Sequence, residues 1–275
     1  MRRRVLALLL CSVFFFVALP ASAADRPQEV TIQAGRFQLH GCYWTPDSPP
    51  PYRVMIFNHG SEKNPAPCGP PDLGYFYQMK GFAFFTFQRH GHGASPGDYI
   101  MDLQRQAYAA HPFDRSAAQS EAVGLQELYN KDVESAVAWL KGQTWADSQH
   151  IAMTGISFGG IQTLLAAEKG LGIKAFLAFA PGAQSWNPVL AERLKRAVLA
   201  APAPIFIVQA QNDYSVEPSK VLGAELGKKG APNRAQIYPP FGTTTQDGHW
   251  RFGAHRDGIA VWAPDVEAFL EVAMR

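Results

Sequence analysis

The chain has 275 residues, of which 47% are hydrophobic and 17% are charged, and its formal net charge is +2. This composition excludes wholesale disorder, and the length fits one large domain or two small ones. The small net charge gives no reason to expect a nucleic-acid partner.

The N-terminus has the pattern of a cleavable secretory signal. Three arginines precede an apolar run of fifteen residues, and small residues follow at Ala21 and Ala23. The run is short for a membrane span, which needs about 20 residues. We therefore predict a signal peptide over residues 1–23, which leaves residues 24–275 as a periplasmic or secreted domain without a stable membrane anchor.

Strand-like and helix-like segments alternate along the rest of the chain. Strand-like runs cover residues 29–34, 53–58, 82–87, 150–155, 174–180, 204–210 and 235–238. Helical spacing covers residues 130–143, 161–167, 218–230 and 263–275, the last with Pro264 in its first turn. This alternation predicts an α/β fold with a mostly parallel central sheet and helices on both faces. The longer connections, residues 98–126 and 182–202, are candidates for a small cap or insertion.

The segment from Gly155 to Gly159 reads G-x-S-x-G, with Ser157 at its centre. It lies between a predicted buried strand and a predicted helix, where a sharp turn has no room for neighbouring β-carbons. Such a turn exposes the serine hydroxyl as a nucleophile. The alternative is a tight turn that only requires small residues, so the other members of a catalytic triad have to be found.

A serine nucleophile needs a base, and the base needs a group that fixes its tautomer. Asp213 follows the predicted strand 204–210 and is the favoured acid, with Glu217 as a rival carboxylate. Two histidines follow the last predicted strand, and of these His249 is the favoured base and His255 the alternative.

Acyl transfer also needs donors for the developing oxyanion. One is expected to be the backbone N–H of Phe158, directly after the nucleophile, and the other that of Ser61, with Glu62 as an alternative. Both of the latter residues lie in the loop after the predicted strand 53–58. His59, in the same loop, is a weak candidate for the base because it precedes the serine.

Several motifs in order resemble those of α/β-hydrolases, and within that superfamily the dienelactone-hydrolase-like and related serine esterase families. They are "NHGS", "RHGHGASPG", "GISFGG", "AQNDYSVEP" and "DGHWRF", and they span nearly all of residues 50–275. The resemblance implies Ser157 as nucleophile, Asp213 as acid and His249 as base. Dienelactone hydrolases carry cysteine as the nucleophile, so the serine favours ester chemistry.

The sequence therefore predicts a serine hydrolase that cleaves a small-molecule carboxylic ester or lactone through an acyl-enzyme, without a metal or an organic cofactor. A small serine peptidase of the prolyl-oligopeptidase type is one alternative, and a non-catalytic binding relative is another. The sequence leaves open the acyl and alcohol groups, the oligomeric state, and whether Cys42 and Cys68 form a disulfide.

Overall fold

The computed structural model describes residues 27–275, so the predicted signal peptide lies outside the described residues. Eight strands form one sheet in the order β1-β2-β4-β3-β5-β6-β7-β8. The strands are β1 (Gln28–Ala34), β2 (Phe37–Trp44), β3 (Tyr52–Asn58), β4 (Phe82–Phe87), β5 (Ala146–Ile156), β6 (Ala175–Phe179), β7 (Ile205–Ala210) and β8 (Arg234–Tyr238). All neighbours from β4 to β8 are parallel, and β1 and β2 are added antiparallel at one edge.

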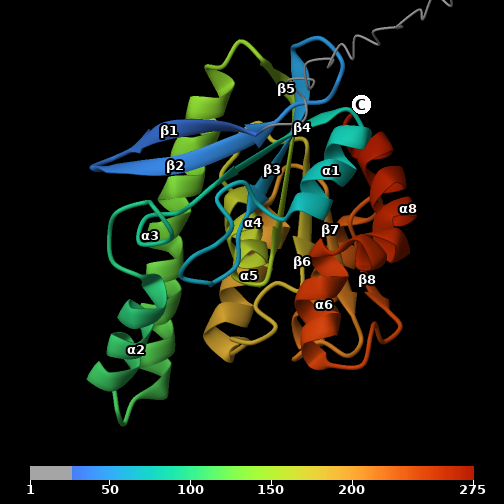
Figure 1. Cartoon of the computed structure of the whole chain (residues 1–275). Coiled ribbons are helices and arrows are strands. Elements are labelled where there is room, and N and C mark those ends of the chain that lie inside the picture. The colour runs from blue at the N-terminus through green and yellow to red at the C-terminus, as the bar shows by residue number, and fades with distance from the viewer. Residues whose placement is uncertain (1–26) are drawn as a thin grey trace, which may run out of the picture.

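Helices cover both faces of the sheet (Figure 1). They are α1 (Pro71–Met79), α2 (Ile100–Ala110), α3 (Arg115–Lys141), α4 (Phe158–Ala167), α5 (Pro188–Ala200), α6 (Glu217–Lys229), α7 (Phe252–Ala254) and α8 (Arg256–Ala273), together with a π-helical turn, η2 (Asp247–Arg251). No helix of residues 27–275 is both long enough and apolar enough to cross a membrane.

Alternate residues of the central strands supply two separate cores. In β3, Val54 and Ile56 pack with α3 to α6, whereas Met55 and Phe57 pack with α1 and α8. Successive side chains of a strand point to opposite faces, so an almost wholly apolar strand has to be covered on both sides. The predicted architecture is confirmed in this respect.

Two details differ from the expectations. Pro264 lies inside α8 and not in its first turn, because the helix already begins at Arg256. Ile259 and Trp262, both before the proline, are buried in the core, and this packing outweighs the backbone hydrogen bond that proline cannot donate. Residues 182–202 contain α5, which packs on α3, α4 and α6 as part of the helical layer.

Candidate active site

Ser157 stands in the turn between β5 and α4 with φ 60° and ψ −118°. This left-handed conformation is unusual for a residue with a side chain. The flanking glycines are required sterically, since a β-carbon at Gly155 would lie 2.3 Å from the carbonyl oxygen of Gly159. A β-carbon at Gly159 would lie 1.9 Å from the carbonyl oxygen of Asn58. The structure thus gives the reason for the G-x-S-x-G spacing.

Asp213 and His249 come together beyond the carboxyl ends of β7 and β8. Nδ1 of His249 lies 2.7 Å from Oδ1 of Asp213, and the residues are 5% and 8% exposed. An N–H at Nδ1 donates to the carboxylate, which leaves Nε2 of the ring free to accept a proton. Ser157 and His249 line the same cavity, so all three predicted triad residues meet at one site.

The carboxylate of Asp213 is held at both of its oxygens. The backbone N–H of Tyr214 donates to Oδ1 at 2.6 Å, and Nε2 of Gln209 donates to Oδ2 at 2.9 Å. Gln209 is itself fixed by the hydroxyl of Ser219, which donates to Oε1 at 2.5 Å. Gln209 was not among the predicted site residues, although a glutamine inside the apolar run "PIFIVQA" is a signal for it.

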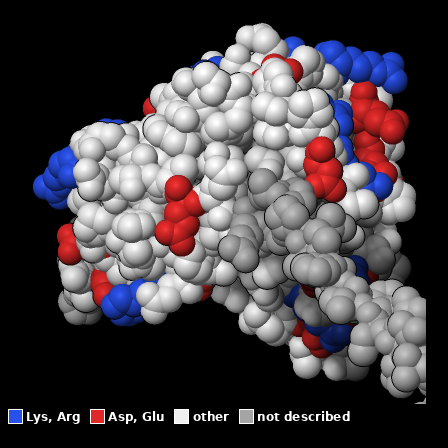
Figure 2. Space-filling model, turned by 45° about the horizontal axis from the view of Figure 1, so that its top comes forward, with Lys and Arg blue, Asp and Glu red and all other residues white. Residues whose placement is uncertain are grey.

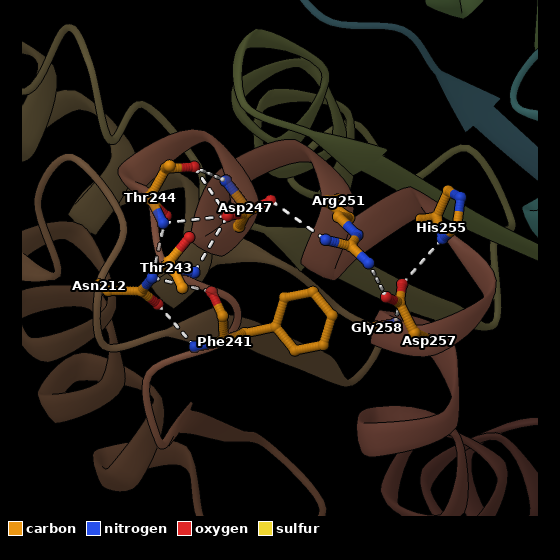
Figure 3. A network of polar contacts seen from close by, with 9 residues as sticks. All are labelled: Asn212, Phe241, Thr243, Thr244, Asp247, Arg251, His255, Asp257 and Gly258. Atoms are coloured by element: carbon orange, nitrogen blue, oxygen red, sulfur yellow. Dashed lines mark hydrogen bonds and ion pairs between the residues drawn. The ribbon is translucent and has the colours of Figure 1, made fainter.

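His255 lies at the rim of the cavity and is not paired with Asp213. Its side chain is 59% exposed, and its Nδ1 lies 2.8 Å from Oδ1 of Asp257. Figure 3 shows Asp257 between His255 and Arg251, on the side of the network away from Asn212. Of the two histidines, only His249 therefore has the geometry of a triad base.

The turn that carries His249 is fixed by Asp247 (Figure 3). One carboxylate oxygen of Asp247 accepts hydrogen bonds from the N–H groups of Thr243 and Thr244, at 3.0 and 2.9 Å, and from the Thr244 hydroxyl at 2.8 Å. These bonds, the Thr244 hydroxyl foremost, lower the pKa of Asp247 to about 2. The loop before η2 is therefore organised by a carboxylate that stays ionised across the ordinary pH range.

Asn212 joins this loop to the loop of Asp213. Its Nδ2 donates to the carbonyl oxygens of Phe241 and Thr244, at 2.8 and 3.0 Å, and its Oδ1 accepts from the N–H of Phe241 at 2.8 Å (Figure 3). Asn212 directly precedes Asp213 in the chain. Asn212 thus links the segments that carry Asp213 and His249 through three hydrogen bonds.

Of the two predicted oxyanion donors, Phe158 directly follows Ser157 in the chain and Ser61 lines the same cavity. Phe158 is the first residue of α4, and the N–H groups of a first helical turn have no acceptor within the helix. Ser61 lies in the loop after β3 and lines the same cavity as Ser157. The hydroxyl of Tyr99 donates to the carbonyl oxygen of Ser61 at 2.5 Å, which holds this loop in place.

His59 has both ring nitrogens engaged in the protein interior. Its Nε2 accepts from the backbone N–H of Arg89 at 3.1 Å, so the proton lies on Nδ1, which is 2.9 Å from the carbonyl oxygen of Gly60. Burial, with the charge of Arg89 second, lowers the pKa of His59 well below its ordinary value. These contacts do not suit a triad base.

The cavity has a volume of about 750 Å³ and is walled mainly by the loop after β3 and by the segment that carries His249. Its apolar lining comes from Phe57, Pro65, Ala66, Pro70, Pro71, Trp250 and Ala254. Its lining contains two carboxylates, Glu62 and Asp72, and no lysine or arginine. Tyr99 and Gln184 are the contributions of the two predicted cap stretches, and α2 and α5 lie outside the cavity wall.

A disulfide between Cys42 and Cys68 ties the cavity loop to strand β2. Nε1 of Trp44 adds a hydrogen bond of 2.9 Å to the carbonyl oxygen of Cys68. Neighbouring residues of this loop, Ala66 and Gly69, line the cavity. The pairing that the sequence left open is thus present, and it anchors one wall of the site.

Comparison with known proteins connects this geometry to a family of enzymes. A family model described as X-Pro dipeptidyl-peptidase (S15 family) matches residues 51–222, which include Ser61, Ser157 and Asp213 but not His249. Among curated proteins, the polyketide transferase grgF of a Penicillium species is 26% identical over 164 residues. The alignment covers 57% of this chain and 49% of that protein, so the chain matches about half the length of this curated relative.

Solved structures show the same fold at low sequence identity. A Pyrococcus furiosus esterase superposes with a TM-score of 0.62 and 15% identity over 91% of each chain. A Pyrococcus horikoshii acylaminoacyl peptidase superposes with a TM-score of 0.67 and 17% identity over 90% of this chain and 42% of that chain. The predicted α/β-hydrolase fold is confirmed.

Proposed function

The chain belongs to the X-Pro dipeptidyl-peptidase (S15) family, and we propose that it is a serine hydrolase that cleaves a small-molecule carboxylic ester or lactone. The observation that carries this proposal is the buried pair of Asp213 and His249 at the cavity that Ser157 lines. This is the arrangement that activates a serine hydroxyl for attack on a carbonyl carbon.

In the proposed first step, Nε2 of His249 takes the proton of the Ser157 hydroxyl as Oγ bonds to the substrate carbonyl carbon. The N–H groups of Phe158 and Ser61 stabilise the oxyanion. The carbon–oxygen bond to the leaving alcohol then breaks, and the alcohol takes the proton from His249. A water molecule attacks the acyl-enzyme by the same route, which releases the acid and restores Ser157.

A second candidate is a serine peptidase, which the description of the matched family favours. The chemistry of the two candidates is shared up to the leaving group. An amide is stabilised by resonance and its nitrogen must be protonated before it leaves, whereas an activated ester lacks both barriers. A triad that cleaves an amide is therefore expected to cleave an activated ester as well. Ester hydrolysis is therefore the activity expected under both candidates.

The test combines covalent labelling with a substrate series. A fluorophosphonate probe is expected to label the wild-type protein and not Ser157→Ala, and this variant should lose a factor of about 10⁴ to 10⁶ in kcat. p-Nitrophenyl esters of increasing chain length, lactones and X-Pro anilides then separate the two candidates. Absence of labelling and of turnover in the folded wild-type protein would instead indicate a non-catalytic relative.

We also propose that the protein is exported to the periplasm or secreted. The support is the sequence of residues 1–23, with its arginines, apolar run and small residues. Intact-mass measurement of the exported protein is expected to give a chain that begins at or near Ala24. An exported chain that retains residues 1–23 would contradict cleavage.

A further inference from the structure

Arg89 is a fully buried arginine that contacts the loop of Ser61, the candidate oxyanion loop, at His59 and Gly60. It follows β4 by two positions, and its exposed fraction is 0%. Within residues 27–275, its Nε and Nη1 atoms make no hydrogen bond. A buried guanidinium with incompletely satisfied donors carries a large desolvation cost. Such a residue needs an explanation beyond packing.

The guanidinium bonds to the backbone of one turn, and its Nη2 also lies 3.0 Å from Nδ1 of His59 in that turn. Its Nη2 donates to the carbonyl oxygen of His59 at 2.9 Å and to that of Gly60 at 2.6 Å. The Gly60 oxygen also accepts from Nδ1 of His59 at 2.9 Å. Two donors therefore hold a single carbonyl group on the inner side of the loop.

The carbonyl of Gly60 and the N–H of Ser61 belong to the same peptide unit. This unit is trans, since the cis bonds among the described residues are those before Pro51 and Pro232. In a planar trans peptide, the C=O and N–H groups point in opposite directions. Fixing the oxygen toward Arg89 therefore directs the N–H of Ser61 away from the interior, on the side of the cavity that Ser61 lines.

The positive charge of Arg89 favours the same N–H group of Ser61 that its hydrogen bonds orient. Burial lowers the pKa of Arg89 to about 10, so the guanidinium stays protonated at neutral pH. Its central carbon lies 4.8 Å from the ring centroid of Phe158, the residue of the other candidate donor. A positive charge at a carbonyl oxygen polarises the peptide and strengthens its N–H as a donor. In a buried site of low dielectric this effect exceeds its size in water.

We propose that Arg89 is a positioning residue of the oxyanion hole, which orients and polarises the Gly60–Ser61 peptide so that the N–H of Ser61 meets the developing oxyanion. This inference rests on the proposed function. It predicts that removing the guanidinium weakens binding of the transition state and leaves binding of the substrate almost unchanged.

The test replaces Arg89 by methionine, which keeps the length of the side chain and removes its charge and donors. We expect kcat for a p-nitrophenyl ester to fall by about 10²-fold, the effect of losing one oxyanion donor, with KM within about threefold. The inhibition constant of a trifluoromethyl ketone, which forms a tetrahedral adduct with the serine, should rise by a similar factor. A role in folding alone would move neither quantity at temperatures where the variant is folded.

Arg193→Met is the matched control, because Arg193 is also buried but is paired with Glu168 and Glu127 on the helical layer. It should lower the melting temperature and leave kcat within about threefold. Arg89→Lys decides the matter if Arg89→Met does not fold. A single ammonium cannot reproduce the guanidinium contacts, so kcat of Arg89→Lys should fall by about tenfold while KM is unchanged.

The role of Arg89 would be overturned if folded Arg89→Met had the kcat and the ketone inhibition constant of the wild-type protein. If Arg89→Met does not fold, the same result in Arg89→Lys would overturn it. The proposed function fails in a different way, namely if the wild-type protein neither reacts with the fluorophosphonate probe nor hydrolyses esters. An active wild-type enzyme with an inactive Ser157→Ala variant and a fully active Arg89→Met variant would overturn the Arg89 inference alone.

Discussion

Nδ1 of His249, in η2, lies 2.7 Å from Oδ1 of Asp213, in the loop after β7, although the two residues stand 36 positions apart. The contact buries an acid and a base at the edge of the cavity that Ser157 lines. His255, only six positions after His249, pairs instead with the half-buried Asp257. The two histidines therefore have different roles in the proposed reaction.

Replacing His249 by alanine should be nearly as severe as Ser157→Ala, because a nucleophile and its base act as a unit. His255→Ala should change kcat by less than about tenfold, as expected of a residue at the rim without a chemical role. Ester kinetics on both variants check this, with circular dichroism to confirm the fold. An inactive His255→Ala beside an active His249→Ala would reverse the assignment.

Asn212→Ala should lower kcat by about 10- to 100-fold, because a displacement of about 1 Å in a catalytic group can cost that much. The variant removes three hydrogen bonds that join the loops of Asp213 and His249. Asn233→Ala is the control, since Asn233 caps the N–H of Ile205 on β7 and does not line the cavity. Equal kcat in the two variants would show that Asn212 does not position the base.

Removing the disulfide should destabilise the fold and loosen the cavity loop. For a separation of 26 residues, the chain-entropy model gives about 3.5 kcal/mol of the free energy of unfolding. The variant with both Cys42→Ala and Cys68→Ala should also have a KM raised several-fold, because this loop walls the cavity. Thermal melts with and without a reducing agent check the prediction. The agent should lower the melting temperature of the wild-type protein and leave that of the double variant unchanged.

The cavity should discriminate against substrates that carry a carboxylate near the scissile bond. Its lining has Glu62 and Asp72 and no basic residue other than histidine, and two unit charges 4 Å apart interact by about 1 kcal/mol even in water. We expect kcat/KM to be about five- to tenfold higher for a neutral ester than for its carboxylated analogue. In Glu62→Gln, this ratio of the two kcat/KM values should be smaller. Glu192→Gln, on α5, is the control, and an unchanged ratio in Glu62→Gln would refute the electrostatic explanation.

Stability should fall as the pH falls below about 6.5, where histidines of the unfolded chain take up protons. Burial, with the charge of Arg89 second, lowers the pKa of His92 to about 3. Between these two pH values the unfolded state binds one more proton at this residue, so the free energy of unfolding falls with the pH by at most about 1.4 kcal/mol per unit. Urea titrations at pH 7, 6 and 5 should show a shallower fall in His92→Phe. Identical slopes would contradict this account.

The fold was predictable where strands are apolar on both faces, as at residues 82–87 and 204–210. Strand β2 was missed because its sequence, "FQLHGCYW", interleaves polar and small residues with apolar ones, although it is paired with β1 and β4 on its two sides. The first half of α3 was missed because its polar residues, such as Gln119 and Gln126, are buried by tertiary contacts that no local pattern shows.

The candidate site was predictable as far as its local motifs reach. The G-x-S-x-G turn, the aspartate after a strand and the histidine after the last strand each have a local signature. Asn212 and Arg89 have none, because each holds backbone that lies 29 positions away in the sequence. Gln209 contacts Asp213, four positions later, and its only signal is a glutamine inside an apolar strand. A charged or amide side chain in or just after an apolar strand indicates a candidate positioning residue, but the sequence does not show what it contacts.

Because φ is 60° at Ser157, stability and catalysis favour different residues at this position. A residue with a side chain pays about 1–3 kcal/mol to hold such a conformation, whereas glycine adopts it freely. A library selected only for thermal robustness would therefore tend to replace the serine by glycine, and a library selected for turnover would keep it. Directed evolution of this protein toward heat resistance would need a catalytic selection at every round to retain the proposed nucleophile.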